Sequence, residues 1–284
     1  MHLHVVLPNE SVDVEPRVIA DLAQRAEQLG YGAVWMPDHL LPPADYGTAY
    51  GGVYEPLITL SYIAATTTRI GLGTSVLLLA LRSPFAVAKQ VATLDRLSHG
   101  RLTLGVGLGW DRDEFTAVGA DFADRAGRTD EALRLLHHLF RVGSGPFEGE
   151  RFGFDTGVFA PSPGEGLRIM VGGTSDAALR RAARVADVWQ SPPIPPEDFA
   201  DLAARLRSQA GADRRIEAGA RAEWADRDVP VQAVTERLRR FEAVGADHVA
   251  VWFGGVDGFG DRMTALAESL PIGTPKPGPP ARTR

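Results

Sequence analysis

The sequence contains no cysteine, and this absence excludes disulfide bridges, thiolate-bound metals and a cysteine nucleophile. It also lacks any apolar run approaching 18 residues, the length that a membrane-spanning helix needs. The stretch from Met1 to Pro8 has no charged segment and reaches proline too early for a signal peptide. We therefore expect a cytoplasmic protein with no membrane partner.

Basic residues and several common motifs are also scarce. There are 30 Lys and Arg against 36 Asp and Glu, a net charge of -6, whereas nucleic-acid binding needs clustered cations. We expect no nucleic-acid partner. The run 105–109 is not a dinucleotide fingerprint, because Trp110 and Arg112 stand where glycine is required. No P-loop occurs, and residues 73–77 lack the last glycine of a nucleophile elbow.

The chain does contain a regular alternation of short apolar strands and amphipathic helices. Eight such units in 284 residues favour a closed (β/α)8 TIM barrel, in one domain over residues 1–270, with a disordered proline-rich tail at 271–284. The segment 217–224 is the weakest strand candidate, because its small residues have little β-propensity. Strands are expected at 3–7, 33–36, 69–76, 102–106, 167–171, 187–190, 217–224 and 249–253.

Two irregular features stand out against this alternation. Residues 143–166, rich in glycine, proline and phenylalanine, alternate like a hairpin and predict an insertion at the rim between strands four and five. In the third strand Gly71 and Gly73 recur at a period of two, so one face lacks side chains; the run 105–109 repeats this pattern. Such faces either form a floor for a planar cofactor or let helices pack closely on the sheet.

In a barrel of this kind the chemistry lies at the carboxyl ends of the strands, which selects the candidate residues. Asp38 and His39 directly follow strand two, where a carboxylate beside an imidazole can bind a ligand or exchange a proton. Capping of loop amides by Asp38 is the alternative. The run Gly172, Gly173, Thr174 and Ser175 precedes a helix and suits either a phosphate or an ordinary N-cap.

Other histidines lie at the wrong ends of their strands. His2 and His4 have the i, i+2 spacing of a metal-binding pair, but they stand at the start of strand one, and His248 precedes strand eight. His137 and His138 fall inside an amphipathic helix. We therefore predict no metal site.

The ordered motifs resemble those of the bacterial luciferase-like flavin and deazaflavin oxidoreductases, and within them the branch that uses coenzyme F420. The resemblance covers roughly residues 1 to 253. It is carried by the segments 26–31 (AEQLGY), 34–39 (VWMPDH), 54–57 (YEPL), 68–76 (TRIGLGTSV), 88–95 (AKQVATLD), 97–102 (LSHGRL), 105–110 (GVGLGW) with 114–115 (EF), and 172–175 (GGTS).

This resemblance implies a TIM barrel with the flavin-like ring at its C-terminal mouth, against a bulge with a cis peptide at Ser75-Val76. Asp38 would contact the ring system, and His39 would serve in proton transfer or substrate contact. Our hypothesis is that Asp38 and His39 together handle the proton that accompanies the hydride. The loop Gly107, Leu108 and Gly109 would lie along the cofactor. Gly172, Gly173, Thr174 and Ser175 would hold its phosphate.

The implied chemistry is hydride transfer between the deazaflavin and a small organic substrate, and the resemblance also suggests a homodimer, since dimers are common in the family. An FMN-dependent two-component monooxygenase is the alternative; a non-catalytic flavin-binding or metal-hydrolase barrel is a third. Where the sugar-phosphate dehydrogenases of the family have an acidic residue after the glycine run, this chain has Trp110. With Tyr46, Tyr50 and Tyr54, Trp110 suggests a more apolar substrate; packing of these aromatic side chains under the long loop is the alternative.

Overall fold

The computed structural model describes residues 1–9, 14–42 and 54–270. The predicted tail, together with Tyr46 and Tyr50, lies outside the described residues. The strands are β1 (His2–Val6), β2 (Ala33–Met36), β3 (Gly71–Thr74), β4 (Leu77–Leu78), β5 (Leu102–Gly107), β6 (Arg168–Gly172), β7 (Val188–Pro193), β8 (Glu217–Glu223) and β9 (His248–Trp252). The helices are α1 (Pro16–Leu29), α2 (Pro56–Thr66), the 3-10 turn η2 (Leu79–Leu81), α3 (Pro84–Leu97), α4 (Arg112–Ala117), α5 (Arg125–Arg141), α6 (Asp176–Val185), α7 (Pro196–Ala210), α8 (Val231–Ala243) and α9 (Phe259–Ser269).

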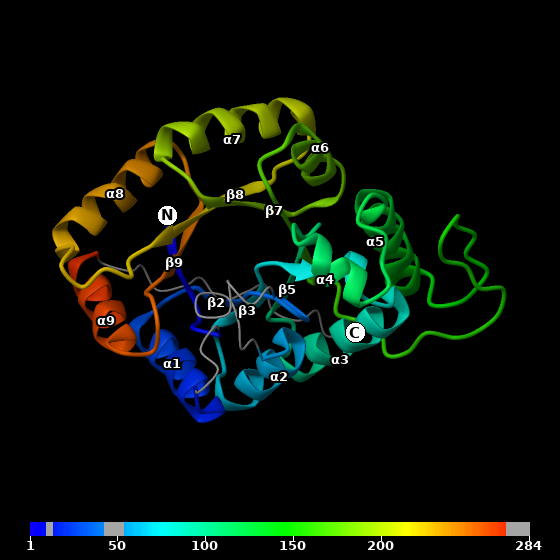
Figure 1. Ribbon diagram of the computed structural model, residues 1–284, viewed down its shortest axis with the longest axis horizontal. Helices are drawn as coiled ribbons and strands as arrows, with labels where there is room; N and C mark the ends of the chain where they lie inside the picture. The colour runs from blue at the N-terminus through cyan, green and yellow to red at the C-terminus, as the bar shows by residue number, and fades with distance from the viewer. Residues whose placement is uncertain (10–13, 43–53, 271–284) are drawn as a thin grey trace.

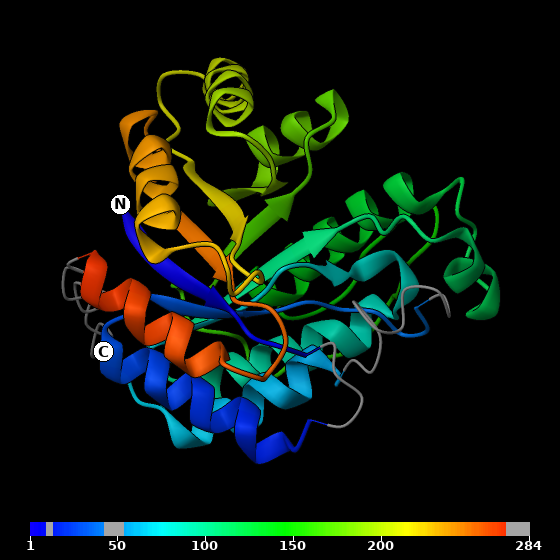
Figure 2. The same cartoon turned by 60° about the vertical axis from the view of Figure 1, so that its left-hand side comes forward.

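The sheet closes on itself and is parallel throughout. Its order is β3-β2-β1-β9-β8-β7-β6-β5-β4, and both β3 and β4 pair with β5, so these two short strands are halves of one barrel strand. The predicted eight-stranded (β/α)8 barrel is therefore confirmed. Figure 1 shows the helices as a ring around the strands, and Figure 2 shows α9 beside α1, where the last helix meets the first.

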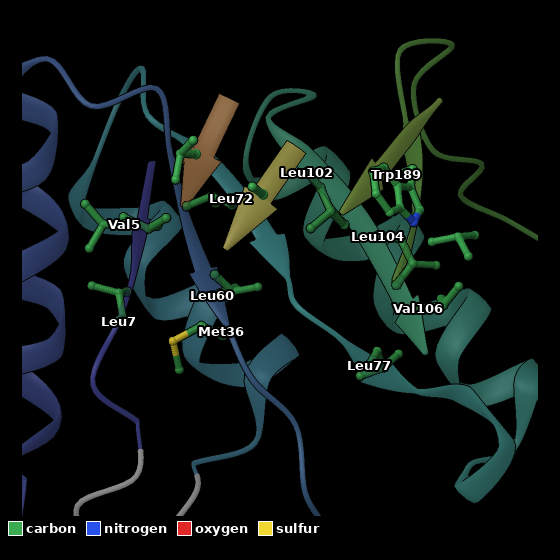
Figure 3. Packing of buried hydrophobic residues seen from close by; sticks show 14 of the residues in the cluster. Val5, Leu7, Met36, Leu60, Leu72, Leu77, Leu102, Leu104, Val106 and Trp189 are labelled. Atoms are coloured by element: carbon green, nitrogen blue, oxygen red, sulfur yellow. The ribbon is translucent and has the colours of Figure 1, made fainter. Parts of the chain in front are cut away.

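Alternation along each strand separates two cores. On β5, Leu102, Leu104 and Val106 face outward and pack with the helices, as Figure 3 shows. The inward-facing residues fill the barrel itself; those that form its apolar cluster are Val6, Ala33, Trp35, Met170, Val188 and Ala250. The barrel interior is thus a packed core, closed below the mouth.

The bare face of the third strand serves this inner core. Trp35 pairs with Gly73 across β2 and β3, and a Cβ added to Gly73 would lie 2.3 Å from the Trp35 ring. The prediction that Gly71 and Gly73 form a floor for a planar cofactor is wrong, because an indole of the protein occupies the space at Gly73. The alternative, close packing of helices, also fails, since these glycines face inward.

Two histidines lie in the same interior, His248 buried and His4 partly exposed at the floor of the barrel. The rings of His4 and His248 stack with centroids 4.4 Å apart, and Trp35 Nε1 donates to His4 Nδ1 at 3.1 Å. A Cβ added to Gly219 would lie 2.0 Å from the Nε2 of His248. This explains why the weakest strand candidate is a regular strand, β8: the small residues that lower its β-propensity admit a ring from β9.

The two imidazoles of the barrel interior predict a dependence of stability on pH. Burial lowers the pKa of His248 to about 4, with Arg168 and His2 also lowering it and Asp247 opposing, and burial with the neighbouring His248 lowers the pKa of His4 well below 6.5. The unfolded chain therefore takes up protons first. The contribution of these histidines to the free energy of unfolding is fully present above pH 6.5 and is lost as the pH falls toward 4. The slope is up to about 1.4 kcal/mol per pH unit for each histidine.

Urea unfolding between pH 4.5 and 7.5 measures this slope. The variant His4→Phe is expected to have a shallower slope than the wild type. The matched control is His137→Gln, which removes an exposed imidazole of α5 and is expected to leave the slope unchanged. Parallel curves for His4→Phe and the wild type would contradict the prediction.

The insertion at 143–166 forms a hairpin-like strap, as its alternation predicted. Antiparallel bridges join Ser144 to Val158 and Phe147 to Phe154. Its location differs from the prediction: the strap lies along the outer side of α5 and α3 instead of at the rim (Figure 1). The buried carboxylate of Glu131 on α5 accepts hydrogen bonds from amides at the tip of the strap.

In the part of the chain that the structure describes, no helix is long and apolar enough to cross a membrane.

Candidate functional site

The predicted site residues converge on one end of the barrel. Asp38 and His39 follow β2, Gly107 ends β5, and Gly172 ends β6. Parallel strands place their carboxyl ends on the same face, which is where TIM barrels bind their ligands. The structure therefore brings together segments that are up to 137 residues apart, the interval from Asp38 to Ser175.

The interruption between β3 and β4 lies at the centre of this face. The peptide bond between Ser75 and Val76 is cis, as the family resemblance implied. A Cβ on Gly107 would lie 2.3 Å from Val76 Cγ2, and one on Gly172 would lie 2.9 Å from Val76 Cγ1. The side chain of Val76 thus sits in the space that these two glycines leave open. We call residues 75–78 the wedge.

Asp38 holds the far end of the wedge. Its Oδ2 accepts a hydrogen bond from the amide of Leu78 at 2.9 Å, and its Oδ1 pairs with Arg82 at 2.6 Å. Arg82 also pairs with Glu55 at 3.1 Å. The Asp38 side chain is fully buried, and both oxygens have partners from the protein. This arrangement supports a positioning part for Asp38 in place of the proton-transfer role predicted from the sequence.

His39 is held by an acid that the sequence did not single out. Its Nδ1 lies 3.1 Å from Oε2 of Glu114, a buried residue of α4. The other carboxylate oxygen, Oε1, accepts hydrogen bonds from the amides of Leu40 and Leu41 at 2.5 and 2.9 Å. The ring of Trp110 meets that of His39 edge to face, with centroids 5.7 Å apart. Glu114 therefore fixes both the imidazole and the backbone that follows it.

The charge on Glu114 determines the tautomer of His39. Burial raises the pKa of Glu114, but hydrogen bonds from His39 and from the amides of Leu41 and Leu40 outweigh it and hold the pKa below its ordinary value. An ionised carboxylate can only accept, so Nδ1 of His39 is the donor. In the neutral ring Nε2 is then an acceptor, ready to take a proton.

The sequence analysis includes Glu114 only as part of the 114–115 motif and assigns it no role. The available signal was an acidic residue beside an apolar one in a short helix capped by Asp111, directly after the glycine run. Its partner His39 lies 75 residues earlier. Nothing in the local pattern indicates that these two side chains meet.

The loop after β6 combines the two roles that the sequence left open. Ser175 is the N-cap of α6, and its Oγ accepts from the amide of Ala178 at 3.2 Å. Gly173 has a φ of 118°, which favours glycine. The first amides of α6 lack partners within the helix, as at every helix start, and suit a phosphate. Asp176 in the same turn pairs with Arg205, which offsets its charge. Phosphate binding by residues 172–175 stays a prediction.

Two further groups at the mouth suit a polar, planar cofactor. The indole N–H of Trp252, at the end of β9, is buried and has no hydrogen-bond partner within the described residues. Arg221 on β8 reaches the carbonyl of Ser75 at 3.5 Å. A heterocycle with carbonyl oxygens offers acceptors for such donors. The wedge, the glycine backbone and these donors together fit a flavin-like ring.

The mouth also exposes apolar side chains next to His39. Leu40, Leu41 and Trp110 are 41%, 58% and 52% exposed. Tyr54, grouped with Trp110 in the sequence, instead donates its hydroxyl to the Val14 carbonyl at 2.7 Å, so it braces the chain. Of the two such aromatic residues that the structure describes, Trp110 and Tyr54, it is Trp110 that lies beside His39.

Comparison with known proteins agrees with this geometry. The model of the luciferase-like monooxygenase family matches residues 1–256. The chain belongs to this family. This luciferase-like protein is 35% identical over 176 residues to the F420-dependent glucose-6-phosphate dehydrogenase of Kineococcus radiotolerans, a match covering 61% of the chain and 51% of that relative.

Two solved structures share the fold of this luciferase-like protein. A monooxygenase from Streptomyces bottropensis superimposes with a TM-score of 0.82 at 20% identity, covering 95% of this chain and 98% of the other. An F420-dependent secondary alcohol dehydrogenase, solved with an F420-acetone adduct, superimposes with a TM-score of 0.80 at 16% identity and the same coverage. At such identities the likeness shows the fold alone. The luciferase-like protein is an oxidoreductase by its family.

Proposed function

We propose that the protein is an F420-dependent oxidoreductase that transfers a hydride between the deazaflavin and a small organic substrate. The observation that carries this proposal is His39, oriented by Glu114 at the barrel mouth beside the wedge. The F420-dependent relative, which matches 61% of the chain, supports the choice of cofactor.

When bound, the deazaflavin would supply a two-electron hydride acceptor or donor at its ring carbon. The protein's own residues would then handle the accompanying proton. Where a substrate loses a hydride from carbon and a proton from its hydroxyl, Nε2 of His39 takes that proton, because Nδ1 is committed to Glu114. In the reverse direction the same atom returns the proton.

The remaining predicted residues would bind and orient the cofactor. Ser75 and Val76 would support the ring, and Gly107, Leu108 and Gly109 would line its edge with backbone. Gly172, Gly173, Thr174 and Ser175 would hold the phosphate through the first amides of α6.

The surroundings of His39 favour an apolar substrate. Leu40 and Trp110 flank the imidazole with exposed apolar surface, and Trp110 stands where the sugar-phosphate dehydrogenases have an acidic residue. Hydrocarbon placed on this surface leaves water, which contributes about 0.8 kcal/mol per buried CH₂. A sugar phosphate has little hydrocarbon to bury and gains no comparable binding free energy from this apolar surface.

Two binding titrations on the purified protein test the cofactor. F420 is expected to bind at least tenfold more tightly than FMN, because Asp38 and the Ser75-Val76 segment resemble those of the F420 branch; tenfold corresponds to about 1.4 kcal/mol. Cofactor fluorescence gives the dissociation constants. Tight binding of FMN with no binding of F420 would overturn the proposal.

The second candidate function is an FMN-dependent monooxygenase on the same barrel. The structural likeness to a monooxygenase favours keeping it as the alternative. Tight FMN binding together with insertion of an oxygen atom from O2 into an organic substrate, at the expense of reduced FMN, would establish it. Binding of either cofactor with neither hydride transfer nor oxygenation of any substrate tested would instead indicate a flavin-binding protein.

A further inference from the structure

A chain of polar side chains runs inside the barrel from its floor to the wedge. Ser75 Oγ donates to Gln190 Oε1 at 2.6 Å, and Gln190 Nε2 lies 3.2 Å from His248 Nε2. His248 stacks on His4, whose Nδ1 accepts from Trp35. We call these five residues the polar spine. Its upper end is the first residue of the wedge.

The hydrogen bonds of the spine have a single consistent direction. Because Gln190 accepts from Ser75 through its oxygen, its nitrogen must donate to His248. His248 therefore accepts at Nε2, as a neutral ring does. Ser75, Gln190 and His248 are exposed by 4%, 2% and 2%, so no solvent replaces these partners.

The spine completes the anchoring of Ser75 by several strands. The Ser75 amide donates to the carbonyl of Met36 on β2 at 2.8 Å, and Arg221 on β8 reaches its carbonyl. Gln190 on β7 is the hydroxyl's partner. At the other end of the wedge, Asp38 binds the Leu78 amide. Loss of Gln190 would leave a buried hydroxyl unpaired and free the side of the wedge that faces the barrel interior.

We propose that Gln190 is a positioning residue: supported by His248, it holds Ser75 so that Val76 stays seated against Gly107 and Gly172 and presents a fixed surface to the cofactor. The part of this inference that concerns the cofactor rests on the proposed function. The part that concerns the wedge does not, because it refers to the protein alone.

The test compares Gln190→Met with two variants on the same strand. Methionine keeps the volume of glutamine but neither accepts from Ser75 nor donates to His248. Val188→Ala opens a cavity on the same inward face below Gln190, and Ser191→Ala removes a buried hydroxyl that has no partner among the described residues. Val188→Ala thus controls for lost stability and Ser191→Ala for substitution at the neighbouring position.

Two readouts apply to these variants. In the cofactor-free protein, amide hydrogen exchange of residues 75–78, measured relative to that of β5, is expected to accelerate at least tenfold in Gln190→Met only. The dissociation constant for F420 is expected to rise about tenfold in the same variant, in line with other losses of a supporting contact. A uniform acceleration, equal in Gln190→Met and Val188→Ala, would overturn the proposal.

The outcomes for the two proposals are distinguishable. If the wild type binds neither F420 nor FMN, the proposed function fails, while the exchange comparison still decides whether Gln190 positions the wedge. If exchange at 75–78 is unchanged in Gln190→Met although the wild type binds F420, the positioning role fails and the proposed function stands.

Discussion

Replacing His39 with alanine is expected to lower turnover roughly 100- to 10,000-fold while changing the affinity for F420 far less. Removal of a positioned acid–base group has an effect of this size. The asymmetry follows from the geometry: the imidazole carries the exchangeable proton at Nε2, whereas the wedge and glycine loops are built from other segments. Steady-state kinetics and cofactor titration on the same preparation measure both quantities.

Glu114→Gln tests the orienting part of this pair. Glutamine can keep one acceptor for the Leu40 and Leu41 amides but removes the charge that makes Nδ1 of His39 the donor. Turnover is expected to fall less than in His39→Ala and to become more dependent on pH. His137→Ala, a change on the exposed side of α5, is the control and should leave turnover unchanged. Full turnover in His39→Ala would exclude a proton-transfer role for His39.

Asp38→Ala is expected to lower the free energy of unfolding by about 3–5 kcal/mol. Truncating one partner of a buried ion pair has a cost of this order, because Arg82 loses its main partner and the Leu78 amide is left buried without an acceptor. Chemical denaturation of the cofactor-free protein measures the loss. A variant as stable as the wild type would show that the ion pair does not hold the wedge.

The variant Asp38→Asn distinguishes a role of Asp38 in anchoring the wedge from a role in proton transfer. Asparagine retains an oxygen for the Leu78 amide but loses the charge that pairs with Arg82, so stability should fall by a smaller amount, about 1–3 kcal/mol. Turnover per folded, cofactor-loaded molecule is expected to stay within tenfold of the wild type. A loss as large as that of His39→Ala would restore the catalytic role that the sequence suggested for Asp38.

The sequence alone determined the order and type of the elements. Apolar residues recur at the strand and helix periods, and eight alternating units in one chain of this length favour a closed parallel barrel. The same pattern placed Asp38, Gly107 and Gly172 at strand ends, hence on one face. These conclusions depend on local periodicity and on the rule that parallel strands end together, so no side-chain contact had to be known.

Tertiary structure alone decided which side chains meet. Gly73 and Gly219 are small because Trp35 and His248 fill the barrel beside them, and nothing near either glycine in the sequence shows this. Glu114 forms a hydrogen bond with His39, which lies 75 residues away in the sequence, and Ser75 forms one with Gln190, which lies 115 residues away. The Ser75–Gln190 pair forms only when the sheet closes, because closure brings distant strands opposite one another in an interior that excludes water. The His39–Glu114 pair forms because the loop after β2 and helix α4 meet at the same end of the barrel.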